Sequence, residues 1–467
     1  MTDPWATFGV DLHLELTGPG LRVGLTDALR RAVRTGRLAP GTRLPSSRTL
    51  AADLGVARNT VADAYAELVA EGWLTARQGS GTRVAPRTVP RGVPRPAAAR
   101  PPQRSGPEYS LRPGVPDLAS FPRTEWLRAS RKALTAAPHE AFGYGDPRGR
   151  PELRTVLADY LARARGVHAD PDRIVVCAGF AHAMMLMGKV LRGRRVREVA
   201  VESYGLDLHW NLLADAGLRT RALPVDGFGS RTGELGREGA VLMTPAHQFP
   251  TGVPLHPDRR TAAVDWARTT DGVILEDDYD GEFRYDRQPV GALQGLDPER
   301  VVYCGTASKS IAPGVRLGWL VLPDSMVSEA ARAKGKSDWM SSSLEQLTLA
   351  EFIASGAYDR HVRAMRLRYR RRRDQLVAAL AERAPGIRVS GIAAGLHAVL
   401  ELPRGTEQSV VQAAARQGLE LYGGAQFRHA DVRDDGRDGR DMLVVGYGTP
   451  SDSAWTGALD ALCRVLP

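Results

Sequence analysis

The sequence contains three cysteines, and they lie far apart at Cys177, Cys304 and Cys463. An odd number of distant cysteines favours neither a disulfide framework nor a zinc site, so reduced thiols are the better interpretation. No apolar run approaches the length of a membrane span, and the first ten residues contain neither a basic leader nor an apolar stretch. The sequence therefore predicts a cytoplasmic protein without a membrane anchor or a bound metal.

Lysine is absent from residues 1–110, although this segment contains 15 arginines against 9 acidic residues. Its net charge is +6, and the rest of the chain carries only +4 of the total of +10. A basic segment beside a nearly balanced one suggests contact with a polyanion. A GC-rich genome would also enrich arginine, so the charge alone is a weak indication.

The segment 86–109 marks the expected division of the chain. It is dense in proline, arginine and alanine and has almost no large apolar residue. Such a segment cannot bury enough surface to fold alone and is expected to form an extended tether. A chain of 467 residues also exceeds what one hydrophobic core usually serves. The sequence predicts domains at 1–85 and 110–467, joined by a linker at 86–109.

The first domain shows three short helical patterns followed by a hairpin. Leu21, Leu25, Leu29 and Val33 recur on one helical face, and glycines follow the first and the third pattern. The predicted elements are helices from Leu21 to about Gly36, from Ser46 or Ser47 to Leu54 and from Arg58 to Glu71, and strands at 73–75 and 82–84.

Two short helices joined by a turn at Gly55 and followed by a β-wing have a shape whose second helix can enter the major groove. Arg58 can chelate a guanine edge, Asn59 can pair with adenine, and Thr60 can reach a phosphate or a thymine methyl. Arg48 is placed to anchor a phosphate, which positions the protein without reading sequence. Spacing alone leaves open an ordinary three-helix module with solvent-facing polar residues.

Three stretches of this domain, at 40–48, 54–61 and 79–82, closely resemble the GntR family of winged helix-turn-helix regulators. The resemblance implies a double-stranded DNA operator as the partner. The residues that it places on DNA are Arg48, Arg58, Asn59, Thr60, Gly79, Ser80 and Gly81.

The second domain alternates helical and short apolar stretches, an order that predicts an α/β domain with a largely parallel sheet. From about Ser328 the chain becomes more helical and closes with a smaller α+β lobe. The expected buried strands are 173–177, 199–201, 240–243, 273–275 and 301–303.

This domain contains the side chains that a pyridoxal 5'-phosphate site needs. Lys309 follows a buried strand and can form the Schiff base, and Arg316 can clamp the phosphate as a bidentate donor. Asp277 ends another strand, where a carboxylate can face the cofactor's ring nitrogen, and Tyr279 can bond the phenolic oxygen. Taken singly, each has a structural explanation, since a lysine after a strand is usually a solvated surface residue. Thr306 and Ser308 add hydroxyl donors for the phosphate.

The order of these residues resembles fold-type-I aminotransferases over most of the second domain. The resemblance places Gly179 and Phe180 at the phosphate, on a helix N-terminus, and Tyr204 against the cofactor ring. Together with the GntR-like head, the chain resembles the MocR family of regulators, which includes GabR-type and PdxR-type proteins. The sequence of residues 244–252 matches the corresponding stretch of those regulators, with Phe249 where aminotransferases have asparagine.

Three departures from the enzyme pattern bear on the effector. Ala178 and Phe180 lack the hydroxyl usual in the phosphate loop, and Leu206 stands where GABA-responsive relatives have arginine. Residues 444–447, which include no arginine, stand where aminotransferases have the arginine that binds the substrate carboxylate. The sequence therefore predicts an effector other than a simply held amino acid, with pyridoxal phosphate itself as the leading candidate. Arg428 or Arg440 could bind a carboxylate instead, so an amine or an amino acid remains an alternative effector.

The sequence predicts a pyridoxal-phosphate-dependent transcription regulator that is not an enzyme, acts as a homodimer and senses its effector through an internal aldimine on Lys309. Two alternatives remain open. A working aminotransferase with an accessory head would turn over amino donors and keto acids, and a residual half-transamination is compatible with the regulator. A DNA-binding protein with a cofactor-free dimerisation body would lack a yellow colour.

Overall fold

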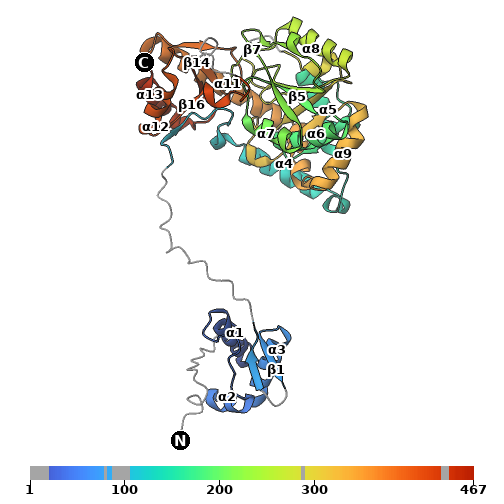
Figure 1. Ribbon diagram of the computed structural model, residues 1–467, viewed down its shortest axis with the longest axis vertical. Coiled ribbons are helices and arrows are strands. Elements are labelled where there is room, and N and C mark those ends of the chain that lie inside the picture. Colours follow the sequence, from blue (N-terminus) through green and yellow to red (C-terminus); the bar gives the residue numbers. More distant parts are fainter. Residues whose placement is uncertain (1–19, 78–80, 87–105, 286–289, 433–440) are drawn as a thin grey trace. The chain divides into compact units, whose positions relative to one another are not determined.

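The computed structural model describes residues 20–77, 81–86, 106–285, 290–432 and 441–467. The chain divides into two compact units, Met1–Arg104 and Ser105–Pro467, which Figure 1 draws with the connecting trace in grey. Most of the predicted linker 86–109 lies outside the described residues, as do Gly79, Ser80 and Arg440. Among the described helices, none is both long enough and apolar enough to cross a bilayer.

The first unit is called the head below, and the second is called the body. The head contains the three predicted helices and the hairpin. Its core is built from buried leucines and valines of all three helices, including Leu25, Leu50 and Val61. Leu21 is 56% exposed, so the apolar stripe of the first helix begins at Leu25 instead. The Oγ of Ser46 caps the second helix by accepting from Thr49 N at 3.1 Å. The elements are α1 (Leu21–Arg34), α2 (Ser47–Leu54), α3 (Arg58–Ala70), β1 (Leu74–Arg77) and β2 (Gly81–Val84).

The body is organised around a seven-stranded sheet in the order β4-β12-β11-β10-β9-β5-β6. All neighbouring pairs are parallel except the two that involve β12. The predicted parallel-rich sheet is therefore confirmed, whereas β6 and β12 had no predicted counterpart. The strands are β4 (Ile174–Cys177), β5 (Glu198–Glu202), β6 (Arg219–Leu223), β9 (Ala240–Met243), β10 (Val273–Asp277), β11 (Val301–Thr306) and β12 (Gly318–Val321).

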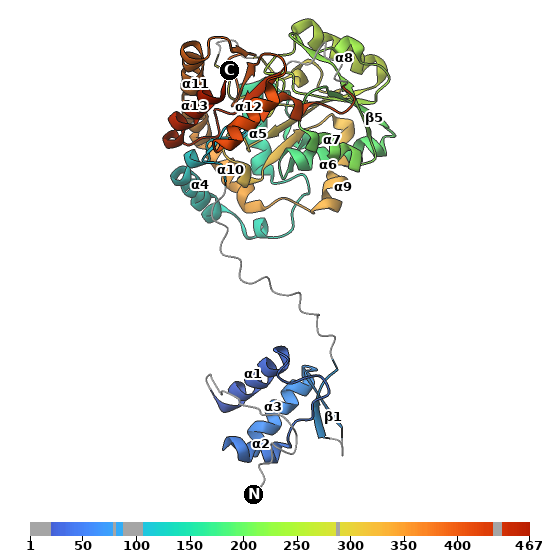
Figure 2. The same ribbon diagram turned by 60° about the vertical axis from the view of Figure 1, so that its left-hand side comes forward.

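Helices cover both faces of this sheet and bury its alternating side chains. The helices α6, α7 and α9 lie on one face, as Figure 2 shows, and share a core cluster that includes Leu186, Leu213 and Ala330. The other face packs against α5, α8 and α10, and α4 packs on α10. These helices are α4 (Arg123–Ala136), α5 (Pro151–Arg165), α6 (Phe180–Gly193), α7 (Asp207–Asp215), α8 (Pro257–Thr270), α9 (Asp324–Ser337) and α10 (Ser343–Ala354).

A smaller lobe, orange to red in Figure 1, contains an antiparallel sheet in the order β13-β14-β17-β16. Three helices, α11, α12 and α13, lie in the same C-terminal part of the chain as this sheet. The combination agrees with the predicted α+β lobe. The first strand of the body, β3 (Tyr109–Ser110), pairs with β15 of this lobe. The remaining elements are β7 (Val225–Asp226), β8 (Gly229–Ser230), α11 (Ala357–Arg383), β13 (Arg388–Ser390), β14 (Ala398–Glu401), α12 (Glu407–Arg416), β15 (Leu419–Glu420), β16 (Tyr422–Gly423), β17 (Met442–Val445) and α13 (Asp452–Val465).

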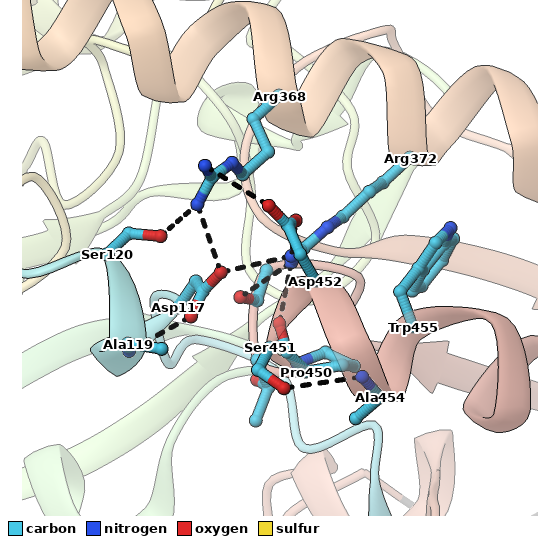
Figure 3. Close-up of polar contacts among 12 residues, drawn as sticks. Asp117, Ala119, Ser120, Arg368, Arg372, Pro450, Ser451, Asp452, Ala454 and Trp455 are labelled. Carbon is cyan, nitrogen blue, oxygen red and sulfur yellow. Dashed lines mark hydrogen bonds and ion pairs between the residues drawn. The ribbon is translucent and has the colours of Figure 1, made fainter.

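Two arginines of α11 tie the beginning of the body to the start of α13, as Figure 3 shows. The Nη2 of Arg372 lies 3.0 Å from Asp117 Oδ2 and 2.6 Å from Asp452 Oδ1. Its Nη1 donates to three backbone carbonyls, the shortest bond being 2.7 Å to Pro450 O. Arg368 reaches the same two carboxylates. This network holds in place the segment between β3 and α4, which contains Asp117.

Candidate cofactor site and DNA-binding surface

The predicted cofactor residues meet at one edge of the seven-stranded sheet. Gly179 follows β4, Asp277 is the last residue of β10, and Lys309 lies three residues after β11. These three strands run in the same direction, because β12 is antiparallel to both β4 and β11. Their carboxyl ends therefore share an edge, which is where α/β sheets bind ligands.

Asp277 presents an unsatisfied acceptor at this edge. Its side chain is 6% exposed, and its Oδ1 has no hydrogen-bond partner among the residues that the structure describes. Burial raises the pKa of Asp277 well above its usual value, against the opposing charge of Lys309. A buried carboxylate oxygen without a donor is costly, and the protonated ring nitrogen of pyridoxal phosphate would supply one. The residue thus fits the cofactor.

Lys309 is half-buried, and the Nζ atom lies close to the backbone of the body's first segment. A methyl group added to Gly114 would be 3.9 Å from this atom. Burial lowers the pKa of Lys309, although the charges of Asp277 and Asp280 raise it. A lowered pKa increases the neutral amine fraction that attacks an aldehyde. The amine therefore has the character that Schiff-base formation needs.

A backbone cradle for an anion lies beside Lys309. Gly179 has a φ of 84° and a buried position at the N-terminus of α6, where amide groups favour negative charge. A side chain here would approach Arg316 Nη1 to 3.3 Å and Ser308 Oγ to 3.9 Å. Thr306 Oγ1 donates to Ser308 Oγ at 2.9 Å. Four of the five residues predicted for the phosphate are therefore brought together around a space that only glycine leaves open.

The two predicted tyrosines lie on different loops of the site. Tyr204 follows β5 and forms a backbone bridge with Arg428, and its carbonyl accepts from Gln248 Nε2 at 2.9 Å. Tyr279 is buried, and its Oη lies 3.1 Å from His247 Nδ1. Burial and the charges of Asp280 and Asp277 raise the pKa of Tyr279 well above its usual value. The hydroxyl therefore stays protonated at neutral pH.

Several residues of the site carry no individual signal in the sequence. The ring of Phe180 packs against His209 with 4.5 Å between centroids. Burial and the charge of Lys309 lower the pKa of His209 to about 3, so this histidine is neutral. His247 and Asp280 both interact with Tyr279, and only the tertiary structure reveals that contact. The stretch 244–252 contained His247, yet its contact with Tyr279 could not be deduced from spacing.

The place of the substrate-binding arginine is apolar. Val444 is fully buried in a cluster with Phe249, Tyr279 and Phe427. The ring of Phe249 stands edge-on to that of Tyr279, with 5.9 Å between centroids. Leu206 is 38% exposed at the start of α7. Neither departure from the enzyme pattern supplies a cation for a carboxylate.

A cavity of about 790 Å³ adjoins Tyr204, between the edge strand β6 and the smaller lobe. Tyr204 and Arg428 both line it, together with Arg221, Arg231 and Glu401. Its size is in the range of small-molecule sites. Arg428 therefore supplies a cation beside Tyr204 in this cavity.

The predicted DNA-contacting side chains of the head are at the start of α3 and on α2. Arg48, Arg58 and Asn59 are exposed, and Thr60 is half-buried. The acidic residues at the other end of α3 are paired with α1, since Arg22 lies 3.1 Å from Glu67 and Arg30 also binds Glu71. This pairing neutralises the far end of the helix and leaves its start basic.

The base of the wing is also basic. A side chain at Gly81 would come within 3.2 Å of Arg43 Nε, and Arg83 Nη1 donates to Gly41 O at 3.0 Å. Tyr65 Oη donates to Pro45 O at 3.1 Å and so ties α3 to the loop before α2. The described part of the wing is therefore held beside the two helices.

Comparison with known proteins agrees with this two-part organisation. Residues 21–84 match the bacterial regulatory proteins of the gntR family, and residues 111–437 match the class I and II aminotransferases. The HTH-type pyridoxine biosynthesis transcriptional regulator PdxR of Corynebacterium glutamicum is 34% identical over 91% of each chain. The probable rhizopine catabolism regulatory protein MocR of Rhizobium meliloti is 32% identical over 85% of each chain. The chain belongs to the MocR group of GntR-type transcription regulators.

Solved structures show the fold of the MocR-type body. An archaeal alanine:glyoxylate aminotransferase has a TM-score of 0.69 at 23% identity, covering 77% of this chain and 90% of that one. A multiple substrate aminotransferase from Thermococcus profundus has a TM-score of 0.68 at 23% identity, with coverages of 78% and 92%. The predicted membership and the fold-type-I body are thereby confirmed. This family relationship identifies the chain as a helix-turn-helix transcription regulator with an aminotransferase-like domain.

Proposed function

We propose that pyridoxal 5'-phosphate bound at Lys309 controls how the head of this regulator binds its operator. The observation that carries the proposal is the buried Asp277 Oδ1, which lacks a partner among the described residues and ends the strand beside that of Lys309. When bound, the cofactor supplies an aldehyde that condenses with an amine and a ring that withdraws electrons. Lys309 would bond it, and Asp277 would hold the proton on its ring nitrogen.

The other site residues would contact the phosphate, the ring and the phenolic oxygen of the cofactor. Arg316, Ser308, Thr306 and the first amides of α6, at Gly179 and Phe180, would bind the phosphate as charge-assisted and dipolar donors. Tyr204 would stack on the ring. Tyr279 would donate to the phenolic oxygen, because its pKa keeps the hydroxyl protonated. The lack of a hydroxyl at Ala178 and Phe180 makes Arg316 and the backbone correspondingly more important.

The visible absorbance of the purified protein tests this proposal. Wild type, after addition of pyridoxal phosphate and removal of the excess, should show a yellow band, and Lys309→Ala should show none. Lys189→Ala, at an exposed position of α6, is the matched control and should keep the band. A colourless wild type, or a band that survives in Lys309→Ala, would refute the assignment.

The effector is proposed to be pyridoxal phosphate itself, in line with the apolar cluster around Val444. An amine or amino acid is the second candidate, because Arg428 lines the cavity beside Tyr204. Operator affinity measured with and without pyridoxal phosphate, and then with amino acids present, separates the two. An amino acid that shifts both the visible band and the operator affinity would favour the second.

We further propose that the protein acts as a homodimer in the cytoplasm and has no sustained aminotransferase turnover. Large apolar side chains are exposed on the body, including Leu127 and Tyr144 at 66% and 89%, and a second subunit would cover them. Paired heads suit repeated half-sites. Light scattering should give twice the chain mass. Assays with an amino donor and a keto acid should show at most one half-reaction per site, and repeated turnover would favour a working aminotransferase.

A further inference from the structure

Three buried polar side chains meet around Tyr279, two residues after the end of β10. His247 Nδ1 lies 2.8 Å from Asp280 Oδ2 and 3.1 Å from Tyr279 Oη. The exposed fractions of residues His247, Asp280 and Tyr279 are 3%, 3% and 8%. None of the residues assigned to the cofactor above explains why a histidine and a second aspartate are buried here.

The surrounding backbone and rings hold this group rigidly. His247 follows β9, and Asp280 comes three residues after the end of β10. A side chain at Gly395 would collide with both of them. The ring of His397 packs against that of His247 with 5.1 Å between centroids, and its Nε2 lies 3.0 Å from Pro250 O. The pair therefore has one fixed arrangement.

The positions of the atoms decide where the protons lie. A carboxylate can only accept, so the hydrogen on His247 Nδ1 faces Asp280. Tyr279 Oη, which lies near the same Nδ1, can then only accept from it. The hydroxyl hydrogen of Tyr279 therefore points away from this nitrogen, and the acceptors within its reach are Asp280, with which the hydroxyl also interacts, and a ligand bound at Lys309. A carboxylate that fixes the proton of a histidine in this way orients the group that the histidine touches.

We propose that the His247–Asp280 pair is a positioning unit that holds the Tyr279 hydroxyl oxygen and leaves its hydrogen available to the ligand bound at Lys309. The proposal rests on the proposed function for the identity of that ligand. The titratable groups that face the pair and Tyr279 are Asp277, Glu202, Lys309 and His397.

The first test uses cofactor-free protein and ¹⁵N-labelled histidine. The wild type should show one slowly exchanging side-chain Nδ1–H signal, which should disappear in Asp280→Asn and in His247→Asn. The same signal should persist in His256→Asn, an exposed control position. A wild type without such a signal would overturn the proposal whether or not the protein binds the cofactor.

The second test follows the midpoint of the pH-dependent change in visible absorbance of the loaded protein. A donor to the phenolic oxygen lowers that oxygen's proton affinity, so Tyr279→Phe should raise the midpoint by about one pH unit. His247→Phe should raise it in the same direction, and should add nothing when Tyr279 is already Phe. His247→Asn retains a donor near the Nδ1 position and should restore most of the wild-type midpoint.

Two results would contradict the assignment to Tyr279. One is an unchanged midpoint in His247→Phe, and the other is an equal shift of that variant in the Tyr279→Phe background. The same side chains include a possible metal-ligand set of His247, Asp280 and His397. Stoichiometric metal in the purified protein, with loss of the Nδ1–H signal on loading, would also overturn the proposal. A protein that takes up no cofactor removes the proposed function, while the histidine signal still decides the arrangement of the pair.

Discussion

Replacing Arg372 should destabilise the body more than any exposed arginine of the same helix. The guanidinium is 3% exposed and bonds two carboxylates and three carbonyls. In Arg372→Met, the carboxylate of Asp117, itself 2% exposed, would lose one of its two arginine partners. Removing one partner of a buried ion pair typically costs about 3–5 kcal/mol. Because Arg368 still reaches Asp117 at 3.3 Å, the lower end, about 3 kcal/mol, is expected.

Calorimetry of the full chain measures this effect as a fall in the melting temperature of the body. A loss of about 3 kcal/mol corresponds to roughly 4–8 °C for a domain of this size. Arg370→Met is the matched control, since Arg370 lies on the same helix with a side chain 60% exposed and 4.0 Å from Asp374. An exposed pair of this kind contributes at most about 1 kcal/mol. Equal melting temperatures for the two variants would show that the buried network does not hold the segment around Asp117.

Three further predictions concern pH, cofactor binding and DNA. Burial and the charge of His247 lower the pKa of His397 to about 3, so the unfolded chain takes up an extra proton first, below about pH 6.5. Stability should therefore fall by up to about 2 kcal/mol between about pH 6.5 and 5, and denaturant melts of His397→Gln should show a smaller fall. Gly179→Ala should weaken pyridoxal phosphate binding at least about tenfold, because it combines a φ of 84° with crowding of Arg316; dialysis equilibrium with an unchanged constant would contradict this. Arg48→Ala should lower the salt slope of operator binding by about one, whereas Arg58→Ala should also relax sequence preference; an unaltered slope in the first variant would remove Arg48 from the phosphate contacts.

Local sequence determined the elements of the head and five of the seven strands of the large sheet. The serine cap at Ser46, the glycine turn at Gly55 and the apolar stripe of α3 act within a few residues, so their pattern can be read directly. Apolar runs such as 240–243 became strands with the predicted bounds. The exposed Leu21 shows the limit, because helical spacing does not reveal where the packing partner ends.

The candidate cofactor residues Lys309, Asp277 and Arg316 could be selected from the sequence because they stand at strand ends and in short motifs. Their individual contacts could not be predicted in this way. The unsatisfied Asp277 Oδ1 and the cradle between Gly179 and Arg316 depend on strands far apart in the chain.

Only the tertiary structure decided which distant side chains share the site. His247 and Tyr279 are 32 positions apart, and Asp117 and Arg372 are 255 apart. Strand β12, like the edge strand β6, was not predicted; β12 is antiparallel to both neighbours and is recognised by what it pairs with. Short-range patterns fix helices, turns and strands, whereas burial and hydrogen bonding between distant segments are set by how the sheet and the two lobes pack.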